Sequence, residues 1–292
     1  MRFRTEIAPG TAPFRLDLSS HLLLVGSCFS DNIGARLMQH GCIATVNPCG
    51  VQYNPQSIAT LFRAALDPES VPDTLFEHDR RMRSWLLPQI FSAPTREEAR
   101  GNFDAAVGTL RRSLAGCGAV ILTFGTAQVW HHIPSAISAF EGTVGNCHKV
   151  PTREFTHTML TPDEIAGEWL ALTKQIRTLN SEVKLIYTVS PVRHLNPSPR
   201  LNTLSKATLH LAVERLVDAD PEGSVYFPAY ELLMDDLRDY RFYSADMTHP
   251  SDQAADYIFE KFAETFYTAA DREQMRLARA ATLRASHRTL LP

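Results

Sequence analysis

Three short, almost continuous apolar runs stand out along the chain, and each of them ends in a polar or glycine-containing loop. These runs are His21–Val25, Ala119–Phe124 and Val183–Val189. Apolar runs of this length, rich in leucine, isoleucine and valine, are typical of strands that are buried on both faces. Val225–Phe227 is a weaker fourth strand, and Ile43–Val46 is a candidate fifth.

Helical patterns separate these strands, notably over Pro94–Leu114 and Pro162–Leu179. The second pattern opens with Thr161 as a cap, a proline at the first helical position and Glu164 three residues after the cap. Apolar strands that alternate with helices predict a three-layer α/β/α fold with a mainly parallel sheet of about five strands. We expect a single domain over residues 1–292, because no linker or break in composition divides the chain.

Two stretches do not fit the alternation of strands and helices. Residues 67–93 contain three prolines and short apolar segments, which favour a hairpin or flap, and residues 129–160 show no sustained period. Long irregular segments inside a compact domain are often functional, so we expect both to be insertions or lid loops. Residues from about 269 to 292 are expected to form a helical tail with a solvated, arginine-rich surface.

Cys28 is the first candidate for chemistry, because it stands between the first strand and a helical pattern over Asp31–His40. A thiol at a helix N-terminus lies near unpaired N–H groups and the positive end of the helix dipole, which favour a thiolate and could stabilise an oxyanion. The plainer alternative is a small buried hydrophobic residue at a strand end. Ser27 is the competing nucleophile.

Asp246 and His249 form the second candidate pair, just before a helical pattern over Pro250–Phe266. A carboxylate and an imidazole at this spacing can act as the orienting acid and the general base for a nucleophile. We therefore predict that His249 is the base and that Asp246 orients it. The alternative is that Asp246 caps the following helix and that His249 is a surface residue.

Both segments resemble blocks of the SGNH/GDSL hydrolases. Gly26–Asp31 is similar to their Gly-Asp-Ser-Leu-Ser-Asp block, with Cys28 at the position of the serine and Ser27 at that of the aspartate, and Asp246 with His249 matches their last block. Nearly the whole chain resembles the related GSCFA-domain proteins. Further segments carry this likeness: Asn47–Gly50, Tyr53–Pro55, Gly125–Ala127, Asn146–Lys149, Thr188–His194 and Asp239–Tyr243.

The resemblance implies an SGNH-hydrolase-like or flavodoxin-like fold and an oxyanion hole built from three donors. In SGNH enzymes these donors are the N–H of the nucleophile, a glycine N–H from the second block and an asparagine side chain from the third. Gly50 is the candidate second-block glycine. The third block is Gly125-Thr126-Ala127, which lacks the asparagine, so that Gln128 or, as we prefer, Asn146 would supply the amide.

Four further loop residues are expected to face a substrate: His148, Lys149, Arg193 and His194. The first two could hold an anionic group such as a carboxylate or phosphate, although each of the four could equally be an ordinary exposed loop residue. No metal is expected, because Cys147 and His148 are adjacent and no second ligand pair has zinc-like spacing. No glycine-rich phosphate-binding motif is present, and we expect no cofactor.

Composition narrows the functional classes. The net charge of −3 gives no indication of a nucleic-acid or membrane partner, and five cysteines without a CxxC motif favour a reduced, cytoplasmic protein. The leading hypothesis is a hydrolase that acts on a small-molecule or carbohydrate ester, or on another acyl group, through Cys28. The alternatives are an acyltransferase with a carbohydrate or other alcohol acceptor, and a non-catalytic ligand-binding protein that keeps the fold.

Overall fold

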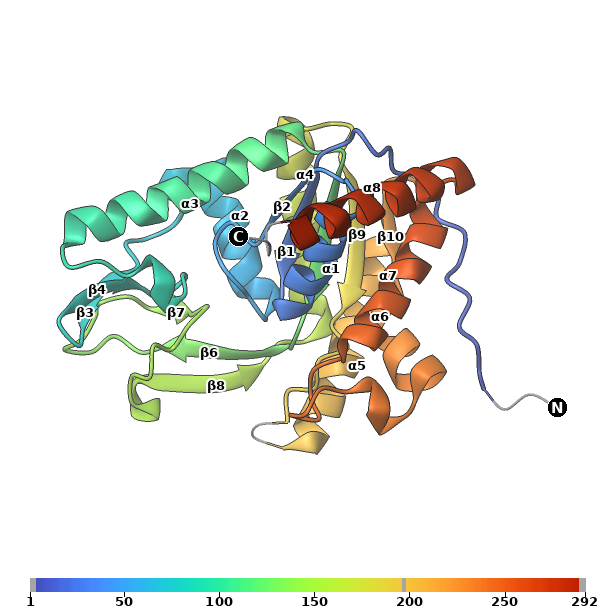
Figure 1. Ribbon diagram of the computed structural model, residues 1–292. Helices are drawn as coiled ribbons and strands as arrows, with labels where there is room; N and C mark the ends of the chain where they lie inside the picture. Colours follow the sequence, from blue (N-terminus) through green and yellow to red (C-terminus); the bar gives the residue numbers. More distant parts are fainter. Residues whose placement is uncertain (1–3, 196–197, 289–292) are drawn as a thin grey trace.

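A five-stranded parallel sheet forms the centre of the computed structural model, which describes residues 4–195 and 198–288 (Figure 1). Its strands are hydrogen-bonded in the order β10-β9-β5-β1-β2. The predicted α/β/α class with a mainly parallel sheet is therefore confirmed. The strands are β1 (Leu22–Gly26), β2 (Ala44–Val46), β5 (Ala119–Phe124), β9 (Lys184–Val189) and β10 (Ser224–Tyr226).

Helices connect the strands, and most of them begin at a polar residue whose side chain accepts a hydrogen bond from the first turn. Ser27 has this role for the first helix, which therefore starts three residues earlier than the periodicity predicts. The helices are α1 (Cys28–Gln39), α2 (Pro55–Leu66), α3 (Arg96–Gly116), α4 (Pro162–Leu179), α5 (Pro199–Asp218), α6 (Ala229–Glu231), the π-helical η4 (Leu232–Leu237), α7 (Asp252–Phe266) and α8 (Ala269–Arg288).

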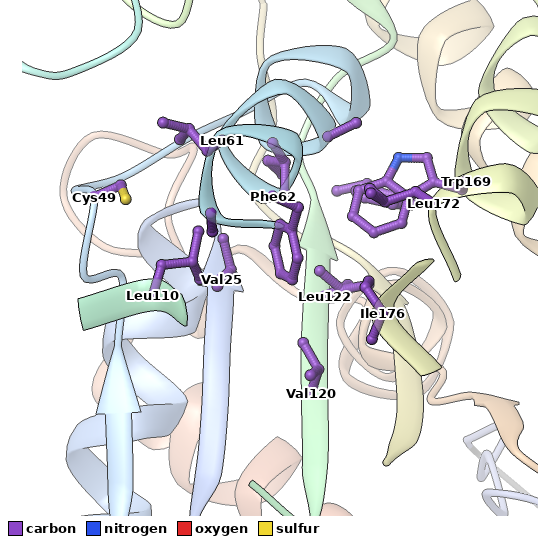
Figure 2. Packing of buried hydrophobic residues seen from close by; sticks show 14 of the residues in the cluster. Val25, Cys49, Leu61, Phe62, Leu110, Val120, Leu122, Trp169, Leu172 and Ile176 are labelled. Atoms are coloured by element: carbon purple, nitrogen blue, oxygen red, sulfur yellow. The ribbon is translucent and has the colours of Figure 1, made fainter. Parts of the chain in front are cut away.

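The two faces of the sheet carry separate apolar clusters, because successive side chains of each strand point to opposite faces. Leu23 and Val25 of β1 pack with helices α2 to α5, whereas Leu22 and Leu24 pack with α1, α7 and α8. Figure 2 shows the first cluster, in which Phe62 of α2 lies over the sheet beside Trp169 of α4. The centroids of the Phe62 and Trp169 rings are 5.7 Å apart.

The two irregular stretches form small antiparallel sheets beside the main one (Figure 1). Residues 67–93 contain the hairpin of β3 (Leu75–His78) and β4 (Arg81–Ser84). Residues 129–160 are not a loop without regular structure: they hold most of a three-stranded sheet in the order β7-β6-β8. Its strands are β6 (Gln128–His132), β7 (Gly142–Thr143) and β8 (Phe155–Met159).

A third apolar cluster joins the two insertions to each other. The rings of Phe76 and Trp85 stack with centroids 3.6 Å apart, and Phe155 packs edge-on against Trp85.

At the other end of the chain, the predicted helical tail corresponds to α8, and its last four residues, 289–292, lie outside the described residues. Among the described helices, none combines the length and the apolar composition that crossing a membrane requires.

Candidate active site

Cys28 is the first residue of α1, directly beyond the carboxyl end of β1. The strand ends at Gly26, whose φ of +150° and closeness to the neighbouring strand leave no room for a side chain: a Cβ there would lie 2.2 Å from the carbonyl oxygen of Thr123. The turn therefore needs glycine, and it brings the Cys28 thiol, which is half-buried, to the start of the helix.

Ser27 is the N-cap of α1 and is fully buried. Its hydroxyl donates to Ser190 Oγ at 3.0 Å and accepts from the backbone N–H of Phe29 at 3.3 Å. The Ser27 hydroxyl is thus committed to capping the helix and to holding the loop after β9. Of the two candidate nucleophiles, only Cys28 has a partly exposed side chain.

Asp246 and His249 form a hydrogen-bonded pair at the surface. The two side chains meet at 2.6 Å between Asp246 Oδ2 and His249 Nδ1, and the other carboxylate oxygen accepts from the backbone N–H groups of Thr248 and His249, each at 2.9 Å. These backbone donors, followed by the imidazole, lower the pKa of Asp246. A neutral His249 that donates from Nδ1 keeps the lone pair of Nε2 free to accept a proton.

Three contacts gather the loops at the carboxyl edge of the sheet. Ser27 binds Ser190, as described above, and the backbone N–H of Arg193 donates to the carbonyl of Thr248 at 3.2 Å, beside His249. The third contact comes from Lys206 of α5, which the sequence analysis did not single out. The thiol of Cys28 and the imidazole of His249 lie on loops joined in this way, and no hydrogen bond connects the two side chains in the described part of the chain.

Lys206 is buried, and its Nζ donates to the carbonyl oxygens of Gly125 at 2.6 Å and Ser190 at 2.7 Å. Burial, and secondarily the charge of Arg193, lower the pKa of Lys206 to about 7. The only sequence signal for this role is its position on the apolar stripe of the helix, three residues before Leu209. A charged residue on such a stripe requires polar partners inside the fold.

The pKa of the Cys28 thiol is raised, not lowered as its place at a helix N-terminus predicts. Burial is the largest cause and the negative charge of Asp31 is the second. The backbone N–H groups of Cys28 and Phe29, together with Lys206, act in the opposite direction but do not outweigh them. Burial and the Asp31 charge arise from the folded chain, and together they favour the protonated thiol.

Three backbone N–H groups in the segments matched to the second and third blocks already have partners. The N–H of Gly50 donates to Asn47 at 2.7 Å, and those of Gly125 and Thr126 both donate to the carbonyl of Tyr53, at 2.7 and 2.9 Å. The backbone N–H of Gly50, the candidate second-block donor, is therefore already paired, as are those of Gly125 and Thr126 in the third block. The Gly50 N–H closes a local turn, whereas the Gly125 and Thr126 N–H groups join two segments that are far apart in the sequence.

The two amide candidates differ in their surroundings. Gln128 is buried at the start of β6, and its Oε1 has no partner among the described residues. Asn146 Oδ1 accepts from the backbone N–H of His148 at 2.8 Å, which leaves its NH2 group as a donor. Asn146 stays the preferred amide, and no contact in the structure tests its role.

His148 does not face a substrate, contrary to the prediction. Its ring is buried against Phe76 and Trp85 and its Nε2 lies 2.8 Å from the carbonyl of Ser84, so that it belongs to the core of the insertions. The neighbouring Lys149 is exposed. Within the described residues, no group of three or more histidine, cysteine or acidic side chains could hold a metal ion.

His194 lies on the loop after β9 and packs edge-on against Tyr53, with ring centroids 5.4 Å apart. Its Nε2 is buried without a partner and would lie 3.2 Å from a Cβ built at Gly125. Burial, followed by the charges of Lys206 and His249, lowers the pKa of His194 to about 4. The ring is therefore a neutral group beside the loop that carries the third-block glycine.

Comparisons with solved structures give matches of low sequence identity. Among solved structures, a proposed platelet activating factor from Streptococcus pneumonia is 10% identical, with a TM-score of 0.42 and 84% of each chain covered. The family 3 carbohydrate esterases from Clostridium thermocellum and Talaromyces cellulolyticus are 14% and 12% identical, with TM-scores of 0.33 and 0.30. They cover 90% and 89% of this chain and 99% of their own.

These identities and TM-scores are too low to transfer an activity, and no curated protein matches the chain. The model of the GSCFA family, in contrast, matches residues 21–262, a range that includes both Cys28 and His249. The match covers most of the chain and agrees with the motifs read from the sequence. The protein belongs to the GSCFA family.

Proposed function

We propose that this protein is a cysteine-dependent hydrolase of an ester or acyl group. The observation that carries the proposal is the Asp246–His249 pair, joined at 2.6 Å and tied through Thr248 to the loop after β9. That loop is itself bound to Ser27, the residue before the half-buried Cys28 thiol. A nucleophile, a base and an orienting carboxylate on converging loops are the three parts of a catalytic triad.

In the proposed reaction, the Cys28 sulfur attacks the carbonyl carbon of the ester while its proton passes to Nε2 of His249. The resulting imidazolium, stabilised by Asp246, gives that proton to the departing alcohol, and a thioester forms on Cys28. Water, deprotonated by His249, then releases the acid and restores the thiol. Because the pKa of Cys28 is raised, the proton leaves during the attack rather than beforehand.

The same thioester could be intercepted by an alcohol, such as a sugar hydroxyl, instead of water. This acyl transfer is the second candidate that a thiol nucleophile favours, since it needs only a change of acceptor. We further propose a small-molecule or carbohydrate ester as substrate and a reducing, cytoplasmic setting. The setting is supported by the five cysteines, which are free.

The test is acylation of the wild-type protein by 4-nitrophenyl acetate, followed by mass spectrometry of the intact chain and its peptides. We expect one acetyl group on the peptide that contains Cys28, release of 4-nitrophenol, and loss of both in Cys28→Ala. Cys147→Ala is the matched control, because Cys147 is also half-buried and free. Adding methanol or glycerol as acceptor separates transfer from hydrolysis by the ester product.

Two results would contradict the proposal. Acetylation and turnover retained in Cys28→Ala would move the chemistry to another residue, with Ser27 the first to examine. An unmodified wild-type protein that releases no 4-nitrophenol from this ester would instead favour the non-catalytic ligand-binding alternative. In either case the Asp246–His249 pair would need a different explanation.

A further inference from the structure

Arg193 carries a guanidinium group that no other described residue neutralises. Its backbone N–H donates to Thr248, but its side chain makes no hydrogen bond or ion pair within the described part of the chain, and its Nε is buried without a partner. Other partly buried arginines differ, since Arg36 and Arg177 bind the carboxylates of Asp256 and Asp220. A buried donor without an acceptor destabilises the free protein, and a ligand can supply the acceptor.

The charge of Arg193 acts on two phenol groups and on a second cation. Burial is the main cause that raises the pKa of Tyr230 and of Tyr243. The positive charge of Arg193 lowers both pKa values, but by less. The charge of Arg193 also helps to lower the pKa of buried Lys206. The acidic residue of α6, Glu231, accepts from the hydroxyl of Tyr226 at 2.7 Å.

Lys206, through its hydrogen bond to the carbonyl of Ser190, is bound to the same loop after β9 that carries Arg193. Lys206 uses backbone carbonyls as acceptors, and no carboxylate of the described residues pairs with either side chain. Arg193 follows β9 on the loop whose backbone contacts Thr248, the residue before His249, so the anion site and the proposed base belong to segments that are bound to each other. The planar fork of a guanidinium matches the paired oxygens of a carboxylate or phosphate.

We propose that Arg193 binds an anionic oxygen group, a carboxylate or a phosphate, on the substrate whose acyl bond Cys28 attacks. This inference rests on the proposed function and names its substrate class: acyl compounds that carry a negative charge a few bonds from the reacting carbonyl. The exposed side chains of Leu195 and Met247 flank Arg193 and His249 in the sequence and offer apolar surface to the rest of such a molecule.

The first test compares two esters with the same leaving group, 4-nitrophenyl acetate and the monoanionic 4-nitrophenyl succinate. We expect the kcat/KM of the wild type to be higher for the succinate than for the acetate. Arg193→Gln should reduce this preference by about 10- to 100-fold, through a higher KM for the succinate, because it removes one charged hydrogen-bonding partner. Arg241→Gln, an exposed arginine on the segment before Asp246, is the control and should keep the preference.

The second test measures binding without turnover. Butyrate, methyl phosphate and neutral 1-butanol, none of which contains a carboxylic ester bond, are each added at about 10 mM during thermal unfolding of the wild type, Arg193→Gln and Arg193→Lys. We expect Tm to rise only with an anion, most in the wild type, less in the lysine variant and least in the glutamine variant. The anion with the larger rise distinguishes a carboxylate from a phosphate ligand.

The outcomes separate the two proposals. If the wild type hydrolyses neither ester but an anion still raises Tm through Arg193, the hydrolase proposal fails and the anion site stands. If hydrolysis occurs but Arg193→Gln keeps the wild-type preference, or slows both esters equally, the anion site is refuted. An equal rise of Tm in all three proteins would refute it as well.

Discussion

Lys206 is the buried charge whose removal has the clearest expected consequence. Its ammonium group donates to the carbonyls of Gly125 and Ser190, and no carboxylate among the described residues pairs with it. Burial lowers the pKa of Lys206 from 10.5 to about 7. The substitution Lys206→Met removes the titrating group and keeps a flexible stem of similar length, so it isolates the effect of the charge.

The sign follows from proton binding. Between about pH 7 and pH 10.5 the unfolded chain holds a proton on Lys206 that the folded chain has released, so the free energy of unfolding of the wild type rises with pH. The slope approaches about 1.4 kcal/mol per pH unit, and the rise over the whole window is about 5 kcal/mol. The methionine variant lacks this contribution. Its lost hydrogen bonds add a difference that does not depend on pH.

The assay is urea unfolding of both proteins at several pH values from about 7 to about 9.5. The stability of the wild type relative to Lys206→Met should increase steadily over this range. Lys174→Met, at an exposed position of α4, is the control and should follow the wild type at every pH. A difference between wild type and Lys206→Met that stays constant with pH would refute the reasoning, because it would mean that folding does not change proton binding at Lys206.

Three further predictions concern the nucleophile, the base and the core. Asp31→Asn should speed alkylation of Cys28 by iodoacetamide at a fixed pH near neutrality, because the Asp31 charge raises the pKa of that thiol; an unchanged rate would contradict this. Asp246→Asn should lower kcat/KM for 4-nitrophenyl acetate by about 10²- to 10⁴-fold while leaving Tm unchanged, because the Asp246–His249 pair is exposed, and a fall in Tm would indicate a structural role. Phe62→Ala should reduce the free energy of unfolding by about 3–5 kcal/mol in urea titrations, since Phe62 is fully buried; a loss below about 1 kcal/mol would mean that the core collapses around the gap.

The carboxyl-edge loops were predictable because their positions follow from local patterns. Apolar runs identify the strands, parallel strands end at one edge, and Gly26 and Ser27 determine how the chain turns into α1. The Asp246–His249 contact was likewise within reach of the sequence, since it joins residues three apart in one loop. Such features depend on neighbours along the chain, and a single sequence contains them.

Contacts between distant segments were decided only by the tertiary structure. The strands β6 and β8 pair over a separation of more than 20 residues, and the histidines and threonines in them give no clear alternation. Lys206 of α5 donates hydrogen bonds to carbonyls in the loops after β5 and β9. The N–H groups of Gly125 and Thr126 donate to the carbonyl of Tyr53, which is far away in the sequence.

The sign of the pKa change at Cys28 has the same origin. The helix N-terminus is local and was visible in the sequence, whereas burial, the larger effect, depends on every segment that packs around the thiol. The chain by itself therefore determined the fold class, the turn that presents Cys28 and the identity of its candidate partners. The three-dimensional packing decided their charge states and which donors remain free, because desolvation and hydrogen-bond pairing are properties of the assembled fold.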